Sequence, residues 1–188
     1  MAPRFPRRLL DTLVIACGFF LLLASLGQFG YMLLRQHQLR QQWDHRTAAP
    51  GAPAARGLRL QIPSIGLDDV VVRGTSYADL LAAPGLLAGS PLPANGGNTV
   101  IAAHRDTFFR HLAELRPGAA IFLRQGPRLF AYRVAARAIV KPTDTAVLAN
   151  TPQPRLTLIT CYPTYWLGPA PDRLVVTAAR VRPPGRQP

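Results

Sequence analysis

The chain has 188 residues, and one long apolar segment near its start leaves about 130 residues, which suits a single domain with an ordinary core. The formal charge is +13, with Lys141 the only lysine, but the arginines are spread through strand-like segments without a basic helix or aromatic–basic alternation. This distribution argues against a nucleic-acid-binding protein. Cys17 lies in the apolar segment and Cys161 in the remainder, which excludes a disulfide within the domain.

The apolar segment runs from Thr12 to Leu34 and predicts a single transmembrane helix. It contains no charged residue, and Gln28 is its one strongly polar side chain. About 20 apolar residues span a bilayer core as a helix. Three arginines lie in residues 1–11, and the positive-inside tendency places that end in the cytoplasm. We therefore expect a protein of the cell membrane whose folded domain is extracytoplasmic.

A cleaved signal peptide is the alternative interpretation of this segment. Ala24–Gly27 offers the small residues that a signal peptidase prefers after an apolar run. The apolar character continues from Phe29 to Leu34, past any cut at that point, and this favours an uncleaved anchor. Arg35, Arg40 and Arg46 follow the segment and weaken the charge asymmetry that sets its orientation.

The chain after the anchor divides into three parts. Residues 35–56 change from a polar, helix-compatible stalk to a linker rich in Pro, Ala and Gly that cannot form a core. Residues 57–182 carry the patterns of a folded domain. Residues 183–188 have the composition of a disordered tail.

Within the domain, short β-rich runs are separated by Pro, Gly and Asn, and several alternate apolar with polar residues. We expect strands at Leu58–Ile62, Val70–Arg73, Thr99–His104, Ala120–Arg124, Leu129–Val140, Arg155–Cys161 and Arg173–Val181. Helical signals are confined to Ser76–Leu81, Phe108–Leu112 and a turn after Thr143–Asp144. Seven or eight short strands with few helices predict a mostly antiparallel sandwich or a closed barrel.

Three stretches concentrate chemically useful residues at predicted strand ends: "GNTVIAAHRD" with His104, "TLITCYP" with Cys161 and "APDRLVV" with Arg173. Strand ends and the loops beyond them are where a rigid sheet presents side chains to a substrate. A thiolate is a nucleophile, imidazole lowers the pKa of a neighbouring thiol and protonates a leaving amine, and arginine donates to an oxyanion. Together they would serve acyl transfer.

Each of these residues alone also has an ordinary structural interpretation. Cys161 can be a small core residue, His104 a hydrogen-bonded structural histidine, and Arg173 a solvated surface charge. No carboxylate pair competes with the set, because Glu114 is the only glutamate and the eight aspartates are scattered.

Taken together with their neighbours, these stretches resemble the sortases, the membrane-anchored cysteine transpeptidases of bacterial cell envelopes. "LRLQIPSIGLDDVVVRG" is similar to the opening strands of the family, and "NGGNTVIAAHRDTFFRHLAEL" to its histidine segment. "LTLITCYPTYWLGPAPDRLVV" resembles its Thr-Leu-x-Thr-Cys motif followed by the arginine strand, and its short loop is most similar to class D. The resemblance implies an eight-stranded sortase-type β-barrel with a few short helices after one N-terminal transmembrane helix.

The resemblance also implies roles for four residues. His104 matches the catalytic histidine, Cys161 the nucleophile, and Arg173 the arginine that positions the substrate and stabilises the oxyanion. Thr160 matches the motif threonine, which would hold the substrate or line the oxyanion region, and we expect it to bind substrate. The implied substrate is a secreted protein with a C-terminal sorting signal of the Leu-Pro-x-Thr-Gly type, cleaved after threonine to give a thioester. An amine on the cell envelope or on another protein subunit would then resolve the thioester.

Some sortases bind calcium through acidic residues near the substrate groove. The span from Ala138 to Arg155 offers only Asp144, which we expect to cap a short helix, so we expect neither a metal nor a cofactor. Two other functions stay open at this stage: a thiol hydrolase that releases the same acyl-enzyme to water, and a membrane-tethered barrel that only binds peptide or wall polymer.

Overall fold

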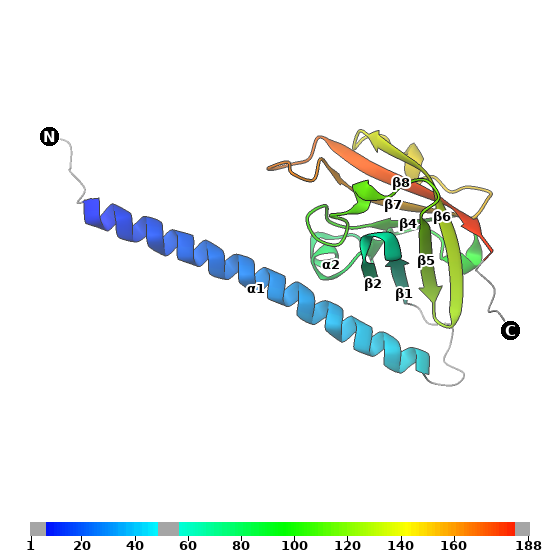
Figure 1. Ribbon diagram of the computed structural model, residues 1–188, viewed down its shortest axis with the longest axis horizontal. Coiled ribbons are helices and arrows are strands. Elements are labelled where there is room, and N and C mark those ends of the chain that lie inside the picture. Colours follow the sequence, from blue (N-terminus) through cyan, green and yellow to red (C-terminus); the bar gives the residue numbers. More distant parts are fainter. Residues whose placement is uncertain (1–6, 49–56, 183–188) are drawn as a thin grey trace.

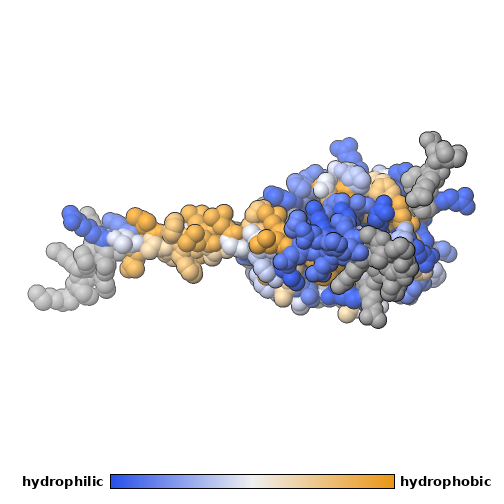
Figure 2. Space-filling view, turned by 90° about the horizontal axis from the view of Figure 1, so that it is seen from below, coloured by the Kyte–Doolittle hydropathy of each residue, from blue (hydrophilic) through white to orange (hydrophobic). Residues whose placement is uncertain are grey.

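The computed structural model describes residues 7–48 and 57–182 and shows one long helix beside a β-barrel (Figure 1). The predicted tail at 183–188 and the Pro/Ala/Gly-rich residues 49–56 lie outside the described residues. The long helix is α1 (Arg7–Ala48), which continues the predicted transmembrane segment through the predicted stalk. Residues 10–45 of α1 are long and apolar enough to cross a membrane. Figure 2 shows this apolar stretch projecting from a barrel whose visible face is mostly hydrophilic.

The barrel is closed in the order β1-β2-β3-β4-β7-β8-β6-β5. The strands are β1 (Leu58–Ile62), β2 (Leu67–Arg73), β3 (Gly85–Leu86), β4 (Asn98–Ala102), β5 (Ala120–Gln125), β6 (Arg128–Val140), β7 (Arg155–Tyr162) and β8 (Asp172–Val181). The helices of the domain are α2 (Tyr77–Ala82) and the 3-10 turns η1 (Pro63–Ile65), η2 (Pro93–Asn95), η3 (Leu112–Glu114) and η4 (Ala146–Leu148). The predicted eight-stranded closed barrel is therefore confirmed.

All seven predicted strands are present, and β3 is the strand that the sequence did not predict. With two residues, Gly85 and Leu86, β3 is too short to show any period. Along one edge it pairs parallel with β2, and along the other edge it pairs antiparallel with β4. Without this short bridge the sheet would be open between β2 and β4.

The helix predicted at Ser76–Leu81 is confirmed as α2. Ser76 is its N-cap, and its hydroxyl accepts a hydrogen bond from the Asp79 amide while the Asp79 carboxylate accepts one from the Ser76 amide. This reciprocal capping box satisfies amides that a helix start would leave without partners. The turn predicted after Thr143–Asp144 contains η4, where Thr145 holds the cap position and the Asp144 carboxylate accepts from the Ala146 amide.

The helix predicted at Phe108–Leu112 is wrong. The segment forms turns, with the Arg110 amide bonded to the Thr107 carbonyl, and only then enters η3. Phe109 and Leu112 are both buried in the core. A tight turn can bury two apolar side chains three positions apart as well as a helix can. The spacing of Phe109 and Leu112 therefore did not distinguish the two.

The barrel interior is filled by one face of each strand. The core residues on strands are Leu58, Leu60, Ile62, Leu67, Val71, Leu86, Ile101, Ile121, Leu123, Phe130, Tyr132, Val134, Leu156, Leu158, Leu174, Val176 and Ala178, and Ala103, Phe109, Leu112 and Leu115 join them from the segments between strands. Their spacing of two residues along each strand is that of side chains alternating between the two faces of a sheet. Polar and charged residues between them face outward, and this alternation decides which side chains the outer surface can display.

Helix α1 docks against the free edge of β2. Gln36 is 5% exposed; its amide donates to the Val70 and Ala82 carbonyls and its carbonyl accepts from the Val70 amide. Arg40 donates to the Asp68 carbonyl two residues along the same edge. An unpaired strand edge attracts other strands, so the helix side chains also protect it.

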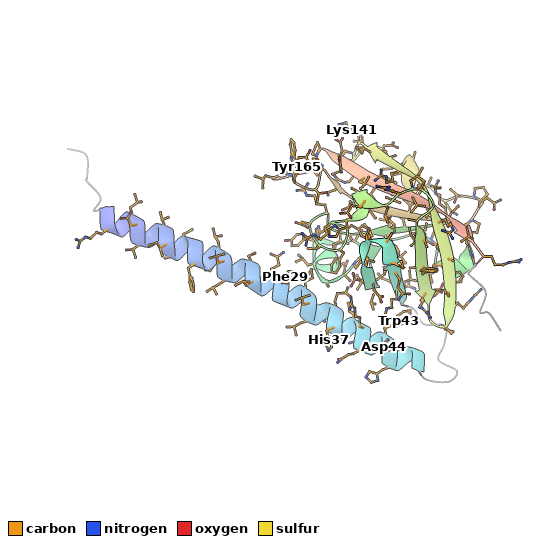
Figure 3. All side chains as sticks on the ribbon, viewed as in Figure 1. Phe29, His37, Trp43, Asp44, Lys141 and Tyr165 are labelled. Atoms are coloured by element: carbon orange, nitrogen blue, oxygen red, sulfur yellow. The ribbon has the colours of Figure 1, made fainter. Side chains whose placement is uncertain are left out.

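One turn further along α1, Trp43 is buried between the helix and the barrel (Figure 3). A Cβ on Gly57 would lie 3.0 Å from the indole ring, so glycine allows the close approach of the domain start. Arg40 also pairs with the carboxylate of Asp69 at 2.9 Å. Burial raises the pKa of Asp69, and the Arg40 pair opposes that shift. The polar half of α1 is thus part of the folded unit.

Gln36→Ala is expected to loosen α1 from the barrel. It would leave the Val70 amide and two buried carbonyls without partners, at about 1–3 kcal/mol for each unsatisfied group. Amide hydrogen exchange in β2, measured on the full chain in detergent micelles, should become about tenfold faster or more, since 1.4 kcal/mol is a factor of ten. The control is Gln42→Ala, an exposed residue of the same helix. Unchanged exchange in Gln36→Ala would show that α1 does not stabilise this edge.

Candidate active site

The three predicted catalytic residues lie on or beside neighbouring strands, because β7 lies between β4 and β8 in the barrel. β4 runs parallel to β7, with Ala102 opposite Ile159. β7 runs antiparallel to β8, with Cys161 directly opposite Arg173. Directly opposite residues of an antiparallel pair project to the same face, with Cβ atoms about 4.5–5.5 Å apart. The register therefore brings the cysteine and the arginine together.

Both side chains belong to the outer face of the sheet. Leu158 on β7 and Leu174 on β8 lie in the core, and side chains alternate along a strand. Cys161, three residues after Leu158, and Arg173, immediately before Leu174, therefore face outward. Each is partly exposed. A buried core role for the cysteine, which was open from the sequence, does not fit this position.

His104 lies at the same end of the adjacent strand. The Ala103 amide donates to the Ile159 carbonyl at 3.2 Å, which continues the β4–β7 pairing one residue beyond the end of β4. Ala103 is in the core, so the next residue, His104, turns to the outer face. Its Nε2 atom is buried and has no hydrogen-bond partner within the described part of the chain.

The aromatic ring of Tyr77 contacts this histidine. The ring centroids of Tyr77 and His104 are 5.8 Å apart with an interplanar angle of 67°, an edge-to-face arrangement. Tyr77 is the first residue of α2 and is largely exposed. It covers one side of the imidazole and narrows the directions from which a substrate can approach.

The guanidinium of Arg173 is oriented by the loop that joins β7 to β8. Its Nη1 donates to the carbonyls of Asp172 at 2.9 Å and Ala170 at 3.3 Å. Next to it, the Asp172 carboxylate accepts a hydrogen bond from Lys141 at 2.7 Å. One edge of the planar guanidinium is therefore bonded to the loop, and a donor to a substrate oxygen has to come from its other edge.

Thr160 is the fourth predicted site residue, and it faces the interior. It is buried, and its hydroxyl donates to the Ala103 carbonyl at 2.8 Å. This bond ties the residue before Cys161 to the residue before His104, and so fixes the spacing of the two. The role in substrate binding stays a prediction.

Sequence reasoning missed Arg105, the neighbour of His104. Its Nη2 donates to the carbonyls of Trp166 at 2.7 Å and Gly168 at 3.0 Å, across the β7–β8 loop. This clamp fixes the loop against the histidine segment. The adjacency of Arg105 to His104 was visible in the sequence, but its partners lie about sixty residues away and carry no local signal.

Among the described residues, no group of three or more His, Cys, Asp or Glu side chains could hold a metal ion. Asp144, the only acidic residue in the stretch considered for calcium, bonds to the Ala146 amide instead.

The sortase domain profile matches residues 60–181, which is most of the chain. The chain belongs to the sortase family. Sortases are cysteine transpeptidases, so the protein is an enzyme of this class, and the predicted resemblance is confirmed.

Two curated sortases and several solved structures are similar to the chain. It is 34% identical to sortase D of Bacillus subtilis over 133 residues, which cover 70% of this chain and 67% of that protein. It is 29% identical to sortase A of Listeria monocytogenes over 105 residues, covering 54% of this chain and 47% of that protein. The predicted similarity to class D is thus supported by a curated relative.

The fold agrees with that of solved sortases. A class D sortase of Clostridium perfringens superposes with a TM-score of 0.71 at 20% identity, covering 79% of this chain and 99% of that one. Sortase C-1 of Actinomyces oris superposes with a TM-score of 0.62 at 27% identity, covering 79% of this sortase and 85% of that chain. The barrel with few short helices is therefore the sortase barrel.

Proposed function

We propose that this sortase is a membrane-anchored transpeptidase that cleaves a C-terminal Leu-Pro-x-Thr-Gly-like sorting signal through a thioester on Cys161. It then transfers the secreted protein to an amine on the cell envelope or on another protein subunit. The observation that carries the proposal is the convergence of Cys161, His104 and Arg173 on one outer face of β4, β7 and β8.

In the first step, the thiol proton of Cys161 passes to His104, and the sulfur attacks the carbonyl carbon of the signal's threonine. The carbonyl oxygen becomes an oxyanion, and the free edge of the Arg173 guanidinium donates hydrogen bonds to it. The peptide bond then breaks, and His104 gives its proton to the departing glycine amine. The products are a thioester on Cys161 and a free peptide amine.

In the second step, the acceptor amine attacks the thioester carbonyl. His104 takes a proton from the amine, the bond to sulfur breaks, and the new amide leaves with Cys161 returned to its starting form. Two features support this use of the site: the Nε2 of His104, which no described residue bonds, and the Tyr77 ring that covers one side of the imidazole.

The proposed location is the cell membrane, crossed once by α1, with the N-terminus in the cytoplasm and the barrel outside. Support comes from the apolar length of α1 and from the arginines at its start. A sorting signal that emerges from the same membrane would then reach a site already placed at its surface.

The test is to analyse the products from the full chain in detergent micelles, given a Leu-Pro-x-Thr-Gly peptide with and without triglycine as acceptor. Transfer predicts a new amide between the threonine and triglycine whenever the acceptor is present. A panel of peptides changed at one motif position at a time measures the preferred signal. Only the free acid, in every case and at any acceptor concentration, would contradict the proposal and indicate a thiol hydrolase.

A further inference from the structure

The loop between β7 and β8 carries three consecutive exposed side chains with large apolar surfaces. Tyr165 is 85% exposed, Trp166 46% and Leu167 95%. Exposing one such residue is ordinary, but three in a row form a patch that favours contact with another apolar surface.

The loop backbone is held while its side chains project. Arg105 bonds to the carbonyls of Trp166 and Gly168, and the base of the loop is fixed by the Lys141–Asp172 pair. Because the backbone is tied at both places, an apolar partner would meet a tip that is already ordered. Less conformational entropy would be lost on contact than for a free loop.

The position of the loop tip, residues 165–167, indicates which apolar surface it contacts. In Figure 3, Tyr165 projects toward the side of the barrel from which the apolar half of α1 extends, and along the long axis of the molecule it lies level with Phe29. Phe29 is exposed within the membrane-crossing stretch of α1. Gln36 and Trp43 fix that helix to the barrel, so the loop tip keeps its position relative to Phe29 along the long axis of the molecule.

We propose that Tyr165, Trp166 and Leu167 insert into the outer interface of the same lipid bilayer that α1 crosses, so that the domain attaches at a second point. The proposal rests on α1 spanning a membrane. Tryptophan and tyrosine concentrate at the membrane–water interface because their rings are amphipathic, and leucine adds apolar surface for the acyl chains. Two points of attachment would stop the barrel from rotating about a single helix.

This attachment has a consequence for the site. Cys161 and Arg173 lie at the ends of the two strands that the loop connects, so insertion of the tip holds the site close to the lipid surface. A sorting signal that emerges from the same membrane would then meet the cysteine close to the lipid surface. The competing occupant of the tip is the sorting peptide itself, and the experiment below separates the two.

The test uses the fluorescence of the full chain reconstituted into phosphatidylcholine–phosphatidylglycerol vesicles in which part of the lipid carries brominated acyl chains. The chain has two tryptophans, so the difference between wild type and Trp166→Phe isolates the emission of Trp166. We expect the brominated lipid to quench this emission and aqueous iodide to leave it largely unquenched. The double variant Tyr165→Ser/Leu167→Ser should lose most of the lipid quenching, whereas Leu129→Ser in the β5–β6 hairpin should retain it.

Quenching of Trp166 by iodide and not by brominated lipid would overturn the proposal. So would protection from iodide that appears only when a Leu-Pro-x-Thr-Gly peptide is added, because the tip would then contact peptide. Release of the chain from the vesicles by alkaline carbonate would show that α1 does not span the bilayer, and the proposal would then fail as well. None of these readings depends on catalysis, so a Cys161→Ala chain should give the same quenching as wild type even if the proposed reaction is wrong.

Discussion

Cys161→Ala is expected to abolish transpeptidation, with a fall in kcat of about 10³-fold or more, since no other group can form the acyl-enzyme. Cys161→Ser should be nearly as inactive, because a serine hydroxyl is not ionised by a neighbouring imidazole as readily as a thiol. Steady-state rates of amide formation on the full chain in micelles measure both.

The matched control is Cys17→Ala. Cys17 is exposed on the apolar half of α1, far along the helix from the barrel, so its loss should leave kcat unchanged. Because Cys161 is only partly buried at the end of β7, neither substitution there should disturb the fold, and the thermal midpoint should stay within a few degrees. Persistent amide formation by Cys161→Ala would remove the cysteine from the mechanism.

Arg173→Lys is expected to lower kcat by about 10²–10³-fold with a smaller change in KM, the range found when one oxyanion donor is removed. The guanidinium bonds the carbonyls of Ala170 and Asp172 through one edge and can still donate through the other. A lysine ammonium carries its donors on one nitrogen and has no planar fork, so it cannot direct separate donors to the loop on one edge and to an oxyanion on the other. Steady-state kinetics and thermal unfolding of the same samples measure the effect.

The control for this substitution is Arg124→Lys, at an exposed position on β5, which should leave kcat unchanged. If Arg173→Lys lowered the thermal midpoint and raised KM while kcat held, the arginine would be a residue that only positions the loop. A kcat near wild type with an unchanged midpoint would exclude the oxyanion role altogether.

The strands could be predicted from the sequence because each buries one face. In β1, Leu58, Leu60 and Ile62 enter the core while Arg59 and Gln61 stay partly exposed, and the alternation of apolar and polar residues is visible in the sequence. The closure of the barrel could not be derived in this way. It depends on β3, two residues whose pairing with β2 and β4 is set by tertiary contacts. The strand pattern left a sandwich and a closed barrel open, and the family resemblance selected the barrel.

The candidate site was predictable in part. His104, Cys161 and Arg173 are marked by motifs at strand ends, and the registers of β4, β7 and β8 bring those ends together. Tyr77 and Arg105 were not found, because their partners are remote in the sequence. No local sequence feature predicts that a tyrosine at the start of a helix contacts a histidine ring, or that an arginine after a histidine bonds to a distant loop.

The docking of α1 shows the same limit. The polar composition of the residues after the apolar segment predicted a stalk that stands apart from the domain. Gln36 and Trp43 nevertheless pack against the barrel, because the edge of β2 offers backbone groups that need partners. A glutamine on a helix gives no sign of which distant strand it will satisfy.

The central claim is that the Cys161 sulfur captures the threonine carbonyl of a sorting signal on the outer face of the barrel. Intact-mass spectrometry of the full chain, mixed with a Leu-Pro-x-Thr-Gly peptide in the absence of an amine acceptor, tests it most directly. The account predicts a mass increase equal to the acyl fragment ending in threonine, mapped to Cys161, released by hydroxylamine and absent from Cys161→Ala. Product formation without any adduct on Cys161, or with the acyl group on another residue, would contradict it.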